Sequence, residues 1–285
     1  MAVAFDTSAW RTEVSGYFAT RDSWLPGAYG PLAQSGLCRL ELTELPASIG
    51  SDSTSTCVIP GVHAAARLGT ILTRGDTLIL DPTAKVFWVG AKPLRDAQAL
   101  ALRNAHALDG ATAWHGPVHI TARWDSAMVT VWIADTLAPA RDSFSGIERW
   151  PLEPVWRIAA QFEAASDEWH RTPTVRGFDL PRQVAGRLAL LVDGEPRTLT
   201  AYSKGRGARS MLVVIRDATS GETSYPAGRF LDVPLPDSTG HTVVDFNLAR
   251  NPDCAFTVAS PCPLPPRENW FDEPLRVGEK WYKHP

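Results

Sequence analysis

The chain has 285 residues, of which 44% are hydrophobic and 21% are charged, and its formal net charge is −3. This length suits one large β domain or two domains of ordinary size, and the composition is that of a globular protein rather than a disordered one. The small negative charge, without a cluster of Lys or Arg, argues against a nucleic-acid partner.

Targeting signals are not visible in the sequence. The first residues lack a basic segment followed by a long apolar run, and no stretch approaches the roughly 18 apolar residues that a membrane helix needs. We therefore expect a cytoplasmic protein with no membrane partner. In a reducing compartment the four cysteines are expected as thiols rather than disulfides: Cys38, Cys57, Cys254 and Cys262.

Strand patterns dominate the first half of the chain. Residues 6–36 come before them and carry loosely spaced aromatic residues, which indicate a short helix and a turn. The runs that follow have the composition and length of β-strands: residues 38–42, 77–80, 85–89, 118–124 and 128–133. Residues 91–108 differ from these runs because they are rich in alanine, which favours a short helix.

Two prolines and a glycine interrupt any strand at residues 144–154, so the chain divides near residue 150. Strand patterns resume at residues 156–162, 186–192, 197–202, 210–216 and 242–246. Strands at this spacing without long helices favour sandwiches or barrels. We predict a mostly β fold, antiparallel and β-sandwich or barrel-like, with few short helices and two tightly packed halves: residues 1–150, including the helical segment, and residues 151–285.

Short polar side chains, a thiol and stiff prolines crowd into the last quarter of the chain. Residues 245–256 read Asp-Phe-Asn-Leu-Ala-Arg-Asn-Pro-Asp-Cys-Ala-Phe, and residues 262–269 read Cys-Pro-Leu-Pro-Pro-Arg-Glu-Asn. Together with residues 225–231 and 278–280 they form what we call the hallmark. With this hallmark the chain resembles the bacterial and archaeal domain of unknown function family 1684, whose chemistry is not established. The resemblance implies family membership and names no reaction.

The resemblance extends beyond the hallmark. Gly36, Leu37 and residues 49–51 look like the family's N-terminal segment, whose strand pattern is similar to that of small β-sandwich phosphopeptide-binding modules. Relatives carry two arginines on the strand that ends at the position of Asp135. Here residues 129–135 read Val-Thr-Val-Trp-Ile-Ala-Asp, so the comparison with relatives implies a more apolar ligand, with Trp132 among its contacts.

The polar residues of the hallmark are the strongest candidates for a site. Asp245 and Asn247 lie two residues apart on a predicted strand, so their side chains would share one face. Two interpretations are open for this pair and Asn251: a polar network that pins the following loop, or a carboxylate beside amides that orient a substrate. In the second interpretation Tyr225 would act as a proton donor and Arg229 as a fixed cation. In the first, these two residues would only hold loops in place.

Two further candidates follow a proline-rich stretch, Glu268 and Asn269. Such a stretch is rigid at little entropic cost, and it supports either a binding site or a strap that closes the fold. Cys254 and Cys262 lie eight residues apart with no second pair and no His between them, too few ligands for zinc, so we predict no metal site. Cys254 is then an inert buried thiol or a substrate contact.

The sequence favours a cofactor-independent enzyme that acts on a small, largely apolar organic substrate by acid–base chemistry. The step would be hydrolysis or a cyclisation or isomerisation, in a biosynthetic pathway. The catalytic residues would be Asp245, Tyr225 and Asn247, and the substrate-binding residues Asn251, Arg229, Glu268, Asn269, Trp132 and Cys254. The alternative is a non-catalytic ligand- or peptide-binding protein or scaffold in which the hallmark closes the fold. The sequence indicates neither the substrate nor the oligomeric state.

Overall fold

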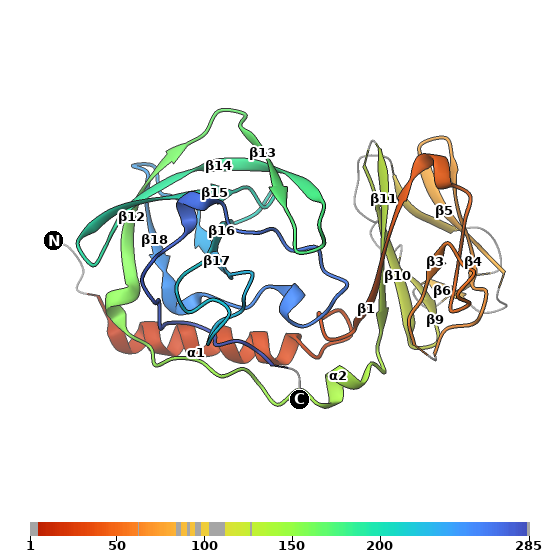
Figure 1. Cartoon of the computed structure of the whole chain (residues 1–285), viewed down its shortest axis with the longest axis horizontal. Helices are drawn as coiled ribbons and strands as arrows, with labels where there is room; N and C mark the ends of the chain where they lie inside the picture. The colour runs from red at the N-terminus through yellow and green to blue at the C-terminus, as the bar shows by residue number, and fades with distance from the viewer. Residues whose placement is uncertain are drawn as a thin grey trace. The chain divides into compact units, whose positions relative to one another are not determined.

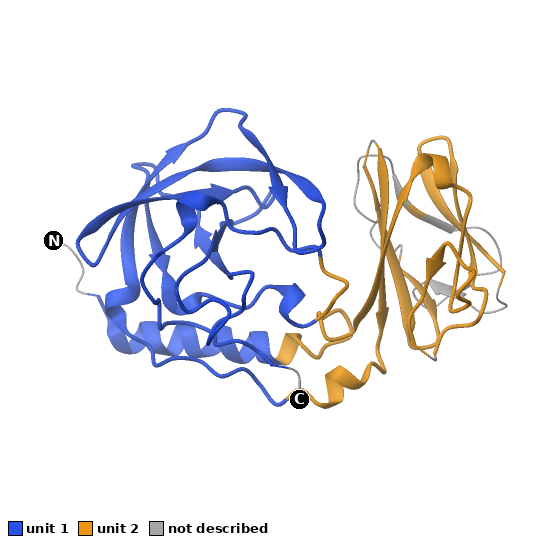
Figure 2. Cartoon of the chain, in the orientation of Figure 1, with its two compact units in different colours: residues 1–22, 145–256, 261–285 blue, residues 23–144, 257–260 orange. Residues whose placement is uncertain are grey.

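The computed structural model describes residues 5–61, 63–83, 87–89, 92–94, 98–102, 112–125 and 127–283 (Figure 1). Across these residues the chain is mostly β, and its strands pair antiparallel except for β2 with β3. The predicted fold class is therefore confirmed. Contacts between Cα atoms divide the chain into two compact units (Figure 2): unit 1 is residues 1–22, 145–256 and 261–285, and unit 2 is residues 23–144 and 257–260.

A nearly closed, barrel-like sheet forms the body of unit 1 (Figure 1). Its strands lie in the order β17-β16-β15-β14-β12-β18, and β13 pairs with β14 off this path. The strands are β12 (Arg157–Ala164), β13 (Trp169–Pro173), β14 (Asp179–Val192), β15 (Glu195–Tyr202), β16 (Ser210–Ile215), β17 (Arg229–Pro234) and β18 (His241–Asp245). In β14 the buried side chains of Leu188, Leu190 and Val192 alternate with more exposed ones, as expected of a strand with one face on a core.

The hairpin between β14 and β15 turns at Asp193 and Gly194. Both residues have positive φ angles, 51° and 83°. A two-residue turn of this kind matches the right-handed twist of the flanking strands, and glycine adopts the conformation without steric cost. The Asp-Gly pair between two strand-like runs is a local sequence signal, and it accounts for this hairpin.

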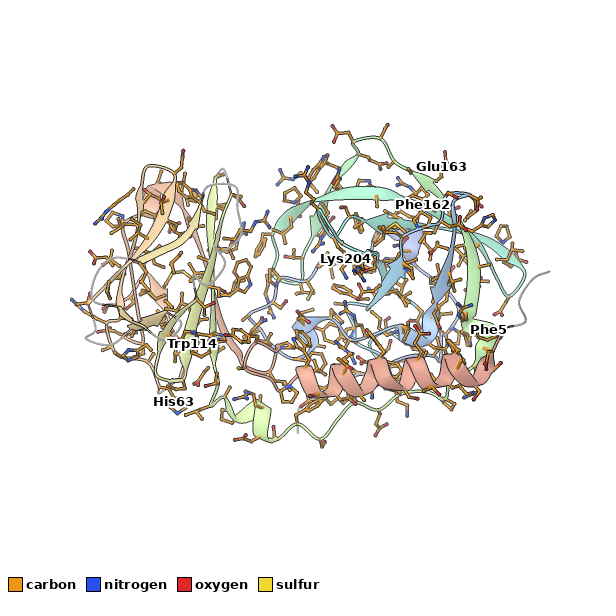
Figure 3. The ribbon with its side chains drawn as sticks, turned by 180° about the vertical axis from the view of Figure 1, so that it is seen from behind. Phe5, His63, Trp114, Phe162, Glu163 and Lys204 are labelled. Atoms are coloured by element: carbon orange, nitrogen blue, oxygen red, sulfur yellow. A yellow bond between two sulfur atoms is a disulfide. The ribbon has the colours of Figure 1, made fainter. Side chains whose placement is uncertain are left out.

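The helix α1 (Thr7–Trp24) begins at a side-chain cap. The Asp6 carboxylate accepts hydrogen bonds from the backbone N–H groups of Ser8 and Ala9 at 2.9 and 3.0 Å. These bonds satisfy two of the free donors at the start of the helix. Phe5 lies directly before this cap (Figure 3).

One stripe of α1 carries the buried side chains Trp10, Val14 and Phe18, which pack with Leu152 and Leu248. Figure 1 shows the helix along one side of the barrel-like sheet. The sequence analysis expected a short helix that belongs to the N-terminal half, and both points are corrected here. The helix has 18 residues. Its first 16 residues belong to unit 1, because the side chains that pack against the buried stripe come from the second half of the chain.

Unit 2 is a sandwich of two sheets that share one apolar core. The sheets have the orders β1-β11-β10-β9-β6-β7 and β3-β2-β4-β5-β8. Their elements are β1 (Gln34–Glu41), β2 (Ala47–Gly50), β3 (Cys57–Val58), β4 (Gly69–Arg74), β5 (Thr77–Pro82), β6 (Phe87–Val89), β7 (Lys92–Leu94), β8 (Gln98–Leu102), β9 (Ala113–His115), β10 (Val118–Trp124) and β11 (Met128–Asp135), followed by the short helix α2 (Pro139–Asp142). Five 3-10 turns lie among the described residues: η1 (Leu42–Glu44), η2 (Pro154–Trp156), η3 (Phe246–Leu248), η4 (Asp253–Ala255) and η5 (Arg267–Asn269).

One expected element differs from the structure. The alanine-rich segment 91–108 contains β7 and β8 where it is described, while residues 91, 95–97 and 103–108 of the expected helix lie outside the described residues. Near the end of the chain, Glu279 makes an isolated bridge with Arg149. One boundary between the units lies between residues 144 and 145, within the predicted break, and the others follow residues 22, 256 and 260.

A disulfide joins Cys38 of β1 to Cys57 of β3, with the two Cα atoms 5.6 Å apart. The expectation of four thiols is therefore wrong for this pair. The bond links the two sheets of the sandwich, a relationship that only the strand pairing reveals. Cys254 and Cys262 are free thiols in the structure.

Candidate functional site

Five polar residues of the hallmark are completely buried, with 0% of their surface exposed: Arg229, Asn247, Asn251, Asn269 and Glu279. Polar groups removed from water are costly unless they are hydrogen-bonded. The partners of each side chain therefore indicate whether it is free to meet a substrate or is committed to the fold.

Asp245 and Asn247 contact each other and two distant segments. Asp245 ends β18, and its Oδ1 accepts hydrogen bonds from the backbone N and the Nδ2 of Asn247 at 3.0 and 2.8 Å. Its Oδ2 accepts one from Nε1 of Trp10 at 2.7 Å. The Asn247 amide also pairs with both backbone groups of Glu153, at 2.9 and 3.0 Å. Residue 247 lies in η3 rather than on the expected strand, since Asp245 caps that turn.

Asn251 belongs to a second cluster, around Glu279. The Glu279 carboxylate accepts hydrogen bonds from the Asn251 backbone N at 2.7 Å and from Nδ2 at 3.1 Å. Nδ2 also donates to the Lys280 carbonyl at 2.7 Å. Arg21 of α1 donates to the same carboxylate and to the Asn251 carbonyl. Asn251 Oδ1 has no hydrogen-bond partner among the described residues.

Arg229 and Tyr225 have partners other than Asp245. The Arg229 guanidinium donates to Asp217 at 2.7 Å and to the carbonyl groups of Leu275 and Val277, and burial lowers its pKa. The Tyr225 hydroxyl donates to the Cys254 carbonyl at 2.9 Å. Burial is the main cause that raises the pKa of Tyr225.

Glu268 and Asn269, which follow the proline-rich stretch, form hydrogen bonds with strand β15. Asn269 pairs with the backbone N and O of Thr200 at 2.7 and 3.0 Å and donates to the Val214 carbonyl at 2.9 Å. Glu268 accepts a hydrogen bond from the Thr200 hydroxyl at 2.6 Å. These contacts connect the proline-rich segment to β15 and β16, which is the arrangement of a strap.

The thiols of Cys254 and Cys262 lie together in the interior of unit 1. The Cys254 backbone N donates to the Cys262 sulfur at 3.2 Å. The hydrogen bond with Cys262, together with burial, raises the pKa of the Cys254 thiol. A thiol in this state is not a nucleophile at neutral pH, because the thiolate is the reactive form.

A small pocket of about 130 Å³ lies beside Asp245 in unit 1. Trp10, Glu13, Arg157 and Asp232 contribute to its lining together with Asp245. The guanidinium of Arg157 also lies over the ring of Phe5, 4.8 Å from its centroid. Of the predicted site residues in the hallmark, Asp245 is the one that lines this pocket.

A larger pocket, of about 440 Å³, lies in unit 2. This volume falls in the range of roughly 300–1,000 Å³ that is typical of small-molecule sites. Its described lining residues are Tyr29, Gln34, His119, Thr121, Ala122, Trp132 and Ala134, and none of them carries a carboxylate, an ammonium or a guanidinium. We call it the aromatic pocket. Trp132, predicted as a ligand contact, lies here in unit 2, whereas the hallmark belongs to unit 1.

His119 is the polar centre of the aromatic pocket. The ring of Tyr29 is stacked on the imidazole, with centroids 5.0 Å apart and an interplanar angle of 22°. Trp114, which comes from β9 (Figure 3), meets it edge-on at 4.5 Å. His119 is 5% exposed, and burial lowers its pKa to about 4. The imidazole is therefore neutral at pH 7.

The match to a family model covers the hallmark and begins after the residues of the aromatic pocket. Residues 142–280 match the family model described as a protein of unknown function, DUF1684. The chain belongs to this family. One similar solved structure is the solution NMR structure of an uncharacterized protein from gene locus rrnAC0354 of Haloarcula marismortui, with 30% identity over 49% of this chain and 78% of that chain and a TM-score of 0.41. No curated protein matches the chain.

The residues of the aromatic pocket, apart from Trp132, were missed by the sequence analysis. They precede residue 142, where the match to the DUF1684 family begins. A signal was nevertheless present in β10. Val118, Ile120 and Ala122 face the sandwich core, so His119 and Thr121 emerge on the opposite face. Arg123 follows them on that face. A histidine on this face beside a tryptophan on the next strand would have indicated a ligand surface.

The described residues contain no group of three or more His, Cys, Asp or Glu side chains placed to hold a metal ion. No helix among them is both long enough and apolar enough to cross a membrane.

Proposed function

We propose that the protein binds a small, largely apolar organic molecule in the aromatic pocket, without a cofactor and without catalysis, and that the hallmark closes the fold of unit 1. The observation that carries the proposal is the lining of this pocket. Tyr29, His119 and Trp132 offer aromatic surface, and the described lining has no charged group that would favour an ion. Aromatic walls with a few polar atoms are typical of sites for organic ligands.

The bonding of the hallmark supports the second half of the proposal. Asn247, Asn251 and Asn269 direct their amides at backbone groups of distant segments rather than into a pocket. In Asn247 and Asn269 both the oxygen and the nitrogen of the amide are paired with the backbone, so these amides are not available to orient a substrate. Such residues stabilise the ends of strands and the loops between them.

The probe N-phenyl-1-naphthylamine tests the proposal, because this neutral molecule fluoresces strongly only in an apolar environment. We expect saturable binding of one molecule per chain. Trp132→Ala is expected to weaken it by about tenfold or more, since the variant removes one aromatic wall. The matched control is Trp169→Ala, because Trp169 is 57% exposed on β13 of unit 1. Binding that does not saturate, or that Trp132→Ala leaves unchanged, contradicts the proposal.

A second candidate function is acid–base catalysis at Asp245, the interpretation that the sequence favoured. One observation supports it: the Asp245 carboxylate lines the small pocket of unit 1 together with Arg157. Three hydrogen bonds fix the orientation of this carboxylate, and a carboxylate in the wall of a pocket is positioned to accept a proton from a small substrate.

Hydrolysis of 4-nitrophenyl butyrate, a small and largely apolar ester, gives this second candidate a test. If Asp245 is the base, the wild-type chain hydrolyses the ester and Asp245→Asn lowers the rate by more than about tenfold, in the range expected for loss of a general base. A rate within tenfold of the wild type removes Asp245 from any such mechanism. The melting temperature of the variant shows whether a lower rate reflects unfolding.

A further inference from the structure

The polar atoms of the aromatic pocket restrict the ligand more closely than its apolar walls do. The side chains of Gln34, His119 and Thr121 bring an amide, an imidazole and a hydroxyl to the lining, and Tyr29 brings a phenol. All of these groups are neutral at pH 7. A charged ligand would lose its hydration without gaining an opposite charge, which is unfavourable.

One of these polar atoms lacks a partner. Nδ1 of His119 is buried and has no hydrogen bond to any described residue. A buried ring nitrogen without a partner is energetically costly, because it has lost its hydrogen bonds to water and has formed no others. Such an atom in the wall of a pocket points to a ligand that supplies the missing hydrogen bond.

The ring of Tyr29 covers the imidazole but keeps 61% of its own surface in solvent. A flat ligand that reaches His119 therefore has to displace the Tyr29 ring, which covers the imidazole. The position that Tyr29 now occupies, stacked at 5.0 Å on one aromatic ring and edge-on to Trp114 at 6.0 Å, suits another planar ring.

We propose that the ligand is an uncharged planar aromatic ring with a hydroxyl group, which forms a hydrogen bond with His119. This inference rests on the proposed function and specifies the ligand class of the same pocket. A neutral imidazole has one donor nitrogen and one acceptor nitrogen, and a hydroxyl both donates and accepts, so it pairs with Nδ1 in either tautomer. The aromatic ring replaces the stacking contact of Tyr29.

Three probes that share one ring system separate the contributions of the aromatic ring, the hydroxyl group and a negative charge to binding: naphthalene, 2-naphthol and 2-naphthoate. At pH 7 the first two are neutral and the third is an anion. Their affinities are measured by displacement of N-phenyl-1-naphthylamine. We expect 2-naphthol to bind about tenfold more tightly than naphthalene, which corresponds to one net hydrogen bond. The anionic 2-naphthoate is expected to bind more weakly than both.

The variant His119→Phe keeps an aromatic ring and removes the nitrogen atoms, so naphthalene and 2-naphthol should then bind equally. His241→Phe is the matched control, because it makes the same change at an exposed histidine of β18 in unit 1 and should retain the preference for 2-naphthol. On the wild-type protein, the ¹⁵N resonance of His119 Nδ1 should shift on addition of 2-naphthol but not of naphthalene. This measurement keeps the inference testable even if His119→Phe fails to fold.

The outcomes distinguish this inference from the proposed function. Equal affinities for the three probes, or tightest binding of 2-naphthoate, overturn the uncharged hydroxyl-bearing ligand while ligand binding itself stands. A preference for 2-naphthol that persists in His119→Phe removes His119 from the site. If N-phenyl-1-naphthylamine does not bind in the first place, the proposed function and this inference both fail.

Discussion

Arg21, near the end of α1, and Glu279 form a bidentate ion pair inside unit 1. Nε and Oε1 are 2.6 Å apart, Nη2 and Oε2 are 3.2 Å apart, and the side chains are 6% and 0% exposed. Because 258 positions separate the two residues, the pair ties the first helix to the last segment of the chain. Glu279 also accepts hydrogen bonds from Asn251, so one carboxylate holds three parts of unit 1 together.

Glu279→Gln is expected to lower the free energy of unfolding of unit 1 by about 3–5 kcal/mol, because it leaves the buried Arg21 without its counter-charge. Urea unfolding followed by circular dichroism measures the change. Glu148→Gln is the matched control, since the pair between Glu148 and Lys280 is exposed and its loss should cost less than about 1 kcal/mol. Equal effects of the two variants would show that the Glu279 cluster does not hold the fold.

Asn247→Ala separates a structural from a catalytic hallmark. The variant removes three hydrogen bonds to Glu153 and Asp245, and we expect a loss of about 3 kcal/mol in the free energy of unfolding. If Asn247 instead served catalysis, the variant would be as stable as the wild type or more so, since functional sites store strain. Gln161→Ala removes an exposed amide and serves as the control in the same urea titration.

Much of the sheet structure could be predicted because it depends on local pattern. The run at residues 118–124 matches β10, and the turn at Asp193 and Gly194 joins two predicted strands. The strands β2, β3, β4, β9, β13 and β17 were not predicted. Of these, β2, β3, β9 and β13 have five residues or fewer, and β3 and β13 are held mainly by pairing with a neighbour rather than by a hydrophobic run of their own.

The candidate sites were less predictable, because the partners of a buried side chain come from distant segments and cannot be read from the local sequence. Asp245 and Asn247 were expected on one strand face, but the strand ends at Asp245 and Asn247 turns to Glu153. The disulfide was missed because a reducing compartment was expected, and because the local sequence does not show that Cys38 and Cys57 lie on strands that pack together. Trp114 lies opposite His119 on the neighbouring strand β9, but Tyr29, which stacks on the imidazole, comes from a segment far from β10 in the sequence.

The cysteines can be counted directly. When unreduced protein is denatured and alkylated at the moment of lysis, we expect two modified thiols per chain, Cys254 and Cys262, and four after reduction. Intact-mass measurement decides between these numbers. Four modified thiols before reduction would mean that Cys38 and Cys57 are not joined in the cell. The bond persists in an oxidising compartment, so the expected cytoplasmic location remains a prediction that this count also tests.

The same bond is expected to stabilise unit 2. It closes a loop with a sequence separation of 19 residues, for which the chain-entropy model gives about 3 kcal/mol. Replacing Cys38 and Cys57 together by Ser should therefore lower the midpoint of urea unfolding. Replacing Cys254 by Ser is the single-thiol control in unit 1. An unchanged midpoint in the double variant would show that the bond contributes nothing to stability.

The buried His119 makes unit 2 sensitive to acid. Its pKa in the folded chain is about 4, below the ordinary value of 6.5, because burial disfavours the charged imidazole. Between these two pH values the unfolded chain binds a proton that the folded chain does not, so the free energy of unfolding falls as the pH falls. The loss begins near pH 6.5 and reaches up to about 3 kcal/mol at pH 4.

His119→Phe removes this proton-binding group, so the variant should lose less stability than the wild type between pH 6.5 and pH 4, although its stability at pH 7 can differ. Urea unfolding at half-unit steps of pH measures both slopes. His241→Gln, at an exposed histidine of β18 in unit 1, is the matched control and should keep the wild-type profile. Parallel profiles for His119→Phe and the wild type would mean that the His119 imidazole is not buried in its neutral form, and the argument for an uncharged pocket would lose its central residue.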